Sequence, residues 1–196
     1  MISFSIEGSA PRFIVFHGTG GDEHDLVPLV RTIAPDSGIR SYRGISEENG
    51  MLRWFPRHGP NVFIESEVRD HIEQVMDGLR EDFSSEELEA SIFLGYSNGA
   101  NAIAAMLQLG LVIKRAVLLH PMLVLPDTID LNGVEVFVSI GERDAMIPPF
   151  ESEKLVGFFE EAGAVVTLVR LPGGHGIGRE EVDALARWLK ARSDPR

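Results

Sequence analysis

The chain has 196 residues, of which 44% are hydrophobic and 24% are charged. This length and composition predict one globular domain that spans residues 1–196. The formal net charge of −12 argues against nucleic acid and anionic membrane surfaces as partners, because both would repel an acidic protein.

Cysteine is absent from the sequence, which excludes disulfides, thiolate metal sites and a Cys nucleophile. The first eight residues contain no Lys or Arg and no long apolar run, so they do not resemble a signal peptide. No stretch reaches the roughly 18 apolar residues that a membrane-spanning helix needs. We therefore expect a cytoplasmic protein without membrane insertion.

Strand-like and helix-like segments alternate along the chain. Apolar, β-rich runs predict strands at 12–16, 38–42, 91–96, 116–119, 134–140 and 165–171. Helical spacing of apolar residues predicts helices at 26–33, 65–83, 100–109, 152–162 and 179–190. The segment 44–60, rich in glycine, proline and charge, is interpreted as a long loop. This alternation predicts an α/β fold with a mostly parallel central sheet and helices on both faces, and the short chain leaves little room for a large cap domain.

The strongest motif is Gly95-Tyr96-Ser97-Asn98-Gly99, which lies between a predicted strand and an alanine-rich helix. A serine at such a sharp turn lifts its hydroxyl above the sheet, and glycines two positions away leave room for the neighbouring backbone. The simpler alternative is a tight turn with a helix-capping serine. The strand before it and the helix after it favour Ser97 as a nucleophile.

A serine nucleophile needs a base. His175 follows the last predicted strand and stands between glycines, at the strand end where α/β sheets place their ligands. His120 is the rival, since it also follows a strand, and it is interpreted as a pocket wall or a packed residue. His17 precedes a glycine loop and is expected to hold that loop.

The base needs an orienting carboxylate. Asp144 follows the strand predicted at 134–140, and the chain order Ser97, Asp144, His175 is the order expected of an α/β-hydrolase. Glu142 is a second candidate carboxylate, and Asp127 is a weaker one.

An oxyanion hole needs two hydrogen-bond donors. The backbone N–H of Asn98, next to the nucleophile, is one candidate. The N–H of Thr19, in the loop His17-Gly18-Thr19-Gly20-Gly21, is the other. This loop has neither the Gly-Lys-Ser/Thr ending of a P-loop nor the full GxGxxG pattern, so a nucleotide site is disfavoured.

Taken together, the segments 17–26, 95–99, 141–144 and 172–175 resemble the phospholipase/carboxylesterase family of α/β-hydrolases, the branch of small bacterial carboxylesterases and acyl-protein thioesterases. The segment 42–55 is similar to the bacterial members. The resemblance implies an α/β-hydrolase fold, a Ser-Asp-His triad, Thr19 and Asn98 as oxyanion donors, and a possible homodimer. Asn98 departs from the Gln often seen in the thioesterase members, which weakens a thioesterase assignment, and the segment 53–57 differs in detail.

We therefore expect a serine carboxylesterase that acts on small to medium esters through an acyl-enzyme, without a metal or cofactor. Thioesterase, lysophospholipase and hydrolase of an aromatic ring-cleavage product are alternatives with the same triad. A ligand-binding module that has lost catalysis is the alternative outside enzymes. The expected pocket is lined by Trp54, Phe55, His120, Met122, Met146, Ile147 and Phe150, each of which could instead be an ordinary core residue.

Overall fold

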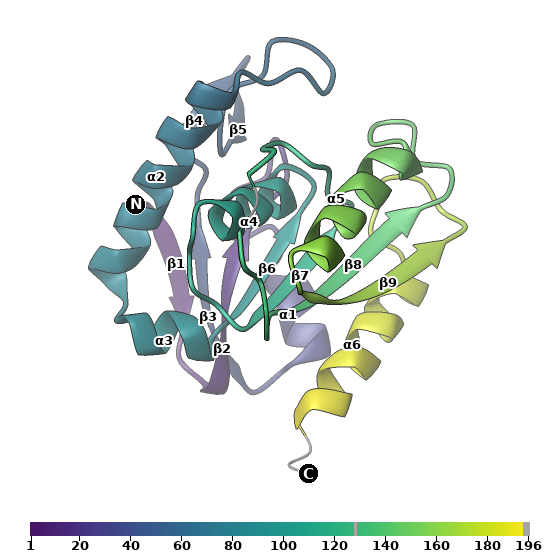
Figure 1. Cartoon of the computed structure of the whole chain (residues 1–196). Coiled ribbons are helices and arrows are strands. Elements are labelled where there is room, and N and C mark those ends of the chain that lie inside the picture. The colour runs from purple at the N-terminus through teal and green to yellow at the C-terminus, as the bar shows by residue number, and fades with distance from the viewer. Residues whose placement is uncertain (128, 194–196) are drawn as a thin grey trace.

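A seven-stranded sheet forms the centre of the computed structural model, which describes residues 1–127 and 129–193 (Figure 1). The strand order is β1-β3-β2-β6-β7-β8-β9, and every neighbouring pair is parallel except β1 with β3. The strands are β1 (Ser3–Ile6), β2 (Ser9–Phe16), β3 (Ser37–Tyr42), β6 (Ile92–Tyr96), β7 (Arg115–Leu119), β8 (Glu135–Gly141) and β9 (Val165–Leu171). The expected mostly parallel α/β sheet is confirmed.

Helices cover both faces of this sheet (Figure 1). One face packs against α2, α3, α4 and α5, and the other packs against α1 and α6. The helices are α1 (Val27–Ile33), α2 (Glu65–Asp82), α3 (Ser85–Ala90), α4 (Asn98–Gln108), α5 (Pro149–Glu161) and α6 (Arg179–Ser193). Because both faces are covered, the central strands β6 and β7 are almost entirely buried and are apolar except for Arg115 at the start of β7.

Three elements differ from the sequence prediction. Strand β1 and helix α3 were not expected. The segment 44–60, expected to be a loop, contains a hairpin of β4 (Ser46–Glu48) and β5 (Met51–Arg53). This hairpin forms its own two-stranded sheet beside the carboxyl ends of the central strands (Figure 1).

The parallel arrangement places the carboxyl ends of β2, β6, β7, β8 and β9 along one edge of the sheet. The loops that follow these strands carry the glycine loop, Ser97, His120, Asp144 and His175. In α/β sheets this edge is where ligands bind. No helix within the described residues is long and apolar enough to cross a membrane.

Candidate active site

Ser97 stands at a sharp turn between β6 and α4 with backbone angles φ 51° and ψ −116°. A positive φ is strained for a residue with a side chain, and such strain is concentrated at functional sites. The flanking glycines are needed sterically: a Cβ on Gly95 would lie 2.6 Å from the Ala100 nitrogen, and one on Gly99 would lie 2.1 Å from the Phe16 oxygen. The turn therefore forms only with glycine at the positions two residues before and two residues after Ser97.

The structure brings together the three residues proposed from the sequence as nucleophile, base and carboxylate. His175 Nε2 lies 2.9 Å from Ser97 Oγ, and His175 Nδ1 lies 2.6 Å from Asp144 Oδ2. Because Nδ1 faces a carboxylate, it carries the proton and donates, which leaves Nε2 free to accept from the serine hydroxyl. The alternative carboxylate Asp127 lies elsewhere, paired with Arg69 on α2.

Asp144 is buried and accepts two further hydrogen bonds at its other oxygen, from the backbone N–H groups of Met146 and Ile147, each at 2.9 Å. Burial alone would raise the pKa of this carboxyl, but the Ile147 N–H and the His175 hydrogen bond outweigh it and hold the pKa below its ordinary value. Asp144 is therefore ionised and fixed in orientation.

A second histidine shares this carboxylate. His120 is buried, has a φ of 51°, and donates from Nδ1 to Asp144 Oδ2 at 3.2 Å. Its Nε2 lies 3.4 Å from Glu181, a carboxylate that is only 1% exposed and also accepts from Ser139. Burial would lower the pKa of His120, but Glu181 and Asp144 outweigh it and raise the pKa, so the imidazole favours its charged form.

The sequence prediction missed Glu181, which opens the acidic first turn of α6. A signal was present, because Glu181 stands four residues before Leu185 and seven before Trp188, on the apolar face of the predicted helix, whereas the adjacent exposed Glu180 does not. The side-chain atoms of His120, Asp144 and His175 lie within 4.8 Å of one another, a spacing that could hold a metal ion. In this structure the same atoms are used in hydrogen bonds among themselves and to Ser97 and Glu181.

The two amides expected to form an oxyanion hole both belong to residues that line the cavity above Ser97. Within the described part of the chain, neither the Thr19 N–H nor the Asn98 N–H has a hydrogen-bond acceptor. The Asn98 side chain accepts from the Trp54 N–H at 2.8 Å, and the Thr19 hydroxyl accepts from Arg53 at 2.7 Å. These side-chain contacts fix both residues at the wall of the cavity.

His17 ties the glycine loop to the rest of the fold. It is fully buried, its Nδ1–H donates to the Gly18 oxygen at 2.6 Å, and its Nε2 accepts from the Gly44 N–H at 2.9 Å. Acceptance at Nε2 requires a neutral ring, and burial lowers the pKa of His17 accordingly.

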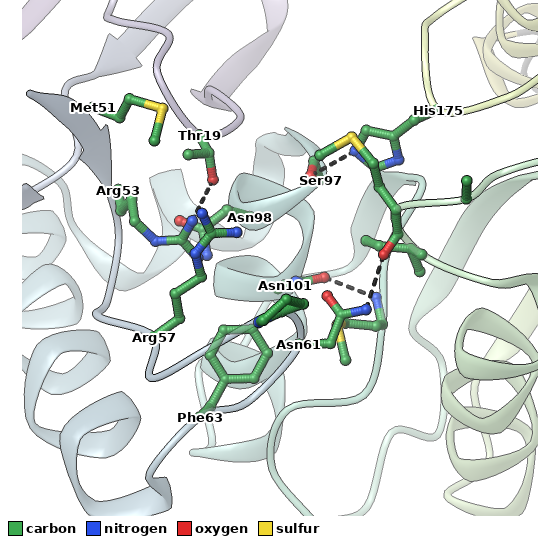
Figure 2. A pocket seen from close by; sticks show the side chains of 15 residues that line it. Thr19, Met51, Arg53, Arg57, Asn61, Phe63, Ser97, Asn98, Asn101 and His175 are labelled. Atoms are coloured by element: carbon green, nitrogen blue, oxygen red, sulfur yellow. Dashed lines mark hydrogen bonds between the residues drawn. The ribbon is translucent and has the colours of Figure 1, made fainter. Parts of the chain in front are cut away.

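Ser97 opens into a cavity of about 420 Å³ (Figure 2). Its lining residues are Thr19, Met51, Arg53, Arg57, Pro60, Asn61, Phe63, Ser97, Asn98, Asn101, Met122, Ala145, Met146, Ile147 and His175. Of the residues expected to line the pocket, Met122, Met146 and Ile147 do so. The sequence prediction missed the two arginines, three asparagine side chains, Met51 and Phe63.

The other expected pocket residues lie elsewhere. Trp54 and Phe55 are fully buried in the core, where Trp54 packs against Phe16 at a ring-centroid distance of 4.7 Å. His120 lies behind Asp144 and does not line the cavity, and Phe150 is an exposed residue on α5. The hairpin and the loop after it explain the difference for Trp54 and Phe55, because these rings turn into the core while Arg53 and Arg57 line the cavity.

Comparisons with known proteins agree with the fold. The chain is 35% identical to "Putative hydrolase MhqD" of Bacillus subtilis over 182 residues, which cover 90% of this chain and 91% of that protein. A Bacillus cereus carboxylesterase structure superposes with a TM-score of 0.90 at 32% identity, covering 96% of this chain and 93% of that one.

A carboxylesterase structure from Mesorhizobium loti superposes with a TM-score of 0.86 at 32% identity, covering 93% of this chain and 89% of that one. No protein-family model matches the sequence. The relatives match almost end to end, and they match a chain whose strand order, absence of a large cap and serine turn are those of an α/β-hydrolase. The chain belongs to the phospholipase/carboxylesterase family of α/β-hydrolases and is an ester hydrolase.

Proposed function

We propose that the chain is a serine carboxylesterase that hydrolyses small to medium carboxylic esters through Ser97, His175 and Asp144. The observation that carries the proposal is the unbroken hydrogen-bonded chain from Ser97 Oγ through His175 to Asp144, at the wall of a cavity that Thr19 and Asn98 also line.

In the proposed reaction, Ser97 Oγ attacks the ester carbonyl while His175 Nε2 takes its proton. The developing negative charge on the carbonyl oxygen is stabilised by the Thr19 and Asn98 N–H groups, which need no reorganisation because the fold holds them free. His175 then gives the proton to the leaving alcohol. A water molecule deprotonated by His175 attacks the acyl-enzyme, and Ser97 is released with its proton restored.

Asp144 keeps His175 in the tautomer with the proton on Nδ1 and stabilises the imidazolium that forms. Its four hydrogen bonds, two from backbone and two from histidines, hold this carboxylate in place during the reaction. Because the expected acyl-enzyme forms at Ser97, that residue is the direct test of the proposal.

The variant Ser97→Ala is expected to lose about 10⁴-fold or more in kcat for p-nitrophenyl acetate, since it removes the nucleophile. Its melting temperature should stay close to that of the wild type, and a fluorophosphonate probe should label the wild type alone. The control Ser66→Ala, at an exposed position on α2, should keep both activity and labelling. Near-normal turnover by Ser97→Ala would overturn the proposal.

A further inference from the structure

The cavity next to Ser97 carries two guanidinium groups from the hairpin and the loop after it. Arg53 ends β5 and its side chain is 3% exposed, and Arg57 follows four residues later and is half-buried. Both line the cavity, and Figure 2 shows both side chains reaching toward Thr19 and Asn98. This wall of the cavity is positively charged in a protein with a net charge of −12.

A single carboxylate contacts this pair within the described residues. Glu48 lies 2.8 Å from Arg57 Nε and 3.7 Å from Arg53 Nε. Two positive charges thus face one negative charge, and the described lining residues of the cavity include no Asp or Glu. Burial and the charge of Arg57 together lower the pKa of Arg53, as expected for guanidiniums held close without enough counter-charge.

An unpaired donor adds to this positive wall. Asn98 is 2% exposed and its side-chain oxygen is committed to the Trp54 N–H. That contact fixes which end of the amide is the NH₂ group, and this Nδ2 has no acceptor within the described part of the chain. Because this nitrogen is enclosed, it does not reach the cavity itself and adds an uncompensated positive dipole beside the two guanidinium groups.

The position of the donors decides which part of an ester they would meet. The leaving alcohol must face His175 Nε2, because that nitrogen gives it the proton. Arg53 and Arg57 lie on the opposite side of Ser97 from His175 (Figure 2). An anion held by these donors therefore belongs to the acyl part of the substrate.

We propose that the preferred substrates are monoesters of dicarboxylic acids, whose free carboxylate is bound by Arg57 and Arg53 and whose ester carbonyl is attacked by Ser97. A guanidinium matches a carboxylate with two parallel hydrogen bonds, which makes arginine the residue suited to this group. The apolar side chains of Phe63, Met122 and Ile147 line the same cavity and suit the methylenes between the two carboxyl groups. The inference rests on the proposed esterase function.

The covalent step is ordinary ester hydrolysis. A bond forms between Ser97 Oγ and the acyl carbon, the ester C–O bond breaks, and the alcohol leaves with the proton carried by His175. Water then releases a dicarboxylate, so the products are one alcohol and one dicarboxylic acid, with no other reactant.

The test compares pairs of ethyl esters that differ only at the far end of the acyl chain: monoethyl glutarate with ethyl pentanoate, and monoethyl adipate with ethyl hexanoate. Ethanol release gives kcat/KM for each. In the wild type the ratio of charged to neutral ester is expected to exceed one in at least one pair. Arg57→Gln should lower that ratio about tenfold, the order of one charge-assisted hydrogen bond, and Arg57→Lys should restore part of it.

The matched control is Arg69→Gln, which removes an arginine of similar exposure that is also paired with one carboxylate, Asp127, outside the cavity. It should leave the ratio unchanged. A wild-type preference for the neutral ester in both pairs, or a ratio that Arg57→Gln does not move, would overturn the inference.

Binding separates this inference from the proposed function. Calorimetry on Ser97→Ala, which cannot form the acyl-enzyme, should give tighter binding of monoethyl glutarate than of ethyl pentanoate, and adding Arg57→Gln should remove the difference. Hydrolysis of the neutral esters without this binding difference would contradict the inference alone. If the wild type hydrolyses none of the esters while Ser97→Ala still binds monoethyl glutarate more tightly than ethyl pentanoate, the proposed function alone is contradicted.

Discussion

Asp144 is shared by two imidazoles, and only one of them reaches Ser97. His175 contacts the serine, whereas His120 is enclosed between Asp144 and Glu181. Two buried carboxylates would repel each other without a cation between them. The positive charge of His120 therefore stabilises the Asp144 carboxylate, and Asp144 keeps its hydrogen bond to His175.

Removing that cation is expected to be costly. His120→Asn keeps a residue that tolerates the positive φ of 51° but leaves Asp144 and Glu181 without their shared partner. We expect the free energy of unfolding to fall by about 3 kcal/mol, the cost of breaking a buried ion pair. Denaturant unfolding measures this loss.

The double variant His120→Asn/Glu181→Gln is the control, because it removes the second buried charge as well. Its loss in free energy of unfolding should be smaller than the sum of the losses in His120→Asn and Glu181→Gln by at least about 1 kcal/mol. Additive losses would show that His120 acts by packing and not as a counter-charge.

Single residues were predictable where chain position fixed their place. Ser97, Asp144 and His175 each follow a strand, so the parallel sheet alone brings them to one edge. Trp54 and Arg53 stand side by side in the sequence, and only the hairpin decides that the ring is buried and the guanidinium faces the cavity. Whether each side chain is buried or faces the cavity depends on contacts between residues far apart in the chain, and no local sequence pattern indicates these contacts.

At the scale of elements, α4 packs tightly against β2 beside the Ser97 turn. Gly99 at the start of α4 lies against the Phe16 carbonyl, and a Cβ there would lie 2.1 Å from that oxygen. The helix and strand could accommodate it only by moving apart, and that movement would shift the Ser97 turn with them.

Gly99→Ala is therefore expected to lower the free energy of unfolding by about 3 kcal/mol, at the upper end of the cost of overpacking a core, and to reduce esterase activity. Gly157→Ala is the matched control, because Gly157 lies within α5 with nothing within 4 Å of its added Cβ. That change should stabilise the protein by about 0.5–1 kcal/mol, the difference between Ala and Gly in a helix. Equal effects of the two substitutions on thermal unfolding would refute the steric argument.

The elements that the sequence did not predict are short and contain polar residues, whereas the equally short strand predicted at 116–119 is apolar throughout. Strand β1 has four residues and helix α3 has six, too few for an apolar period to stand out. For α3 a signal was present: Ser84 and Glu87 form a capping box, the Ser-x-x-Glu pattern that marks a helix start. The β4–β5 hairpin carries no such mark, because its strands have only three residues each.

For the molecule as a whole, buried titratable groups predict how stability changes with pH. The pKa of Asp144 and that of His17 are lowered in the folded chain, so their contributions are complete above the unfolded values and are lost as pH falls. The pKa of His120 is raised, so its contribution is present at low pH and is lost as pH rises through the folded value. Stability is expected to decline on both sides of neutrality.

His17 should account for the first part of the acid decline, because its ordinary pKa of 6.5 lies well above that of a carboxyl. His17→Gln is expected to be about 1–2 kcal/mol less stable than the wild type at pH 7.5, since it loses hydrogen bonds between the glycine loop and Gly44. The gap between the two proteins should narrow from pH 7.5 to pH 5 in urea unfolding. A constant gap over that range would contradict the assignment of a neutral buried imidazole.

The β4–β5 hairpin stands apart from the seven-stranded sheet and joins the site at few points, among them the hydrogen bond from the Gly20 N–H to the Leu52 oxygen and the contact of Arg53 with Thr19. Ser97, Asp144 and His175 all come from the larger sheet. An exchange of this short segment with that of a relative would alter the chemical character of one cavity wall and leave the reacting groups where they are. The architecture thus places one cavity wall and the reacting groups on separate elements, and it marks the hairpin as the segment to graft when new ester selectivities are engineered.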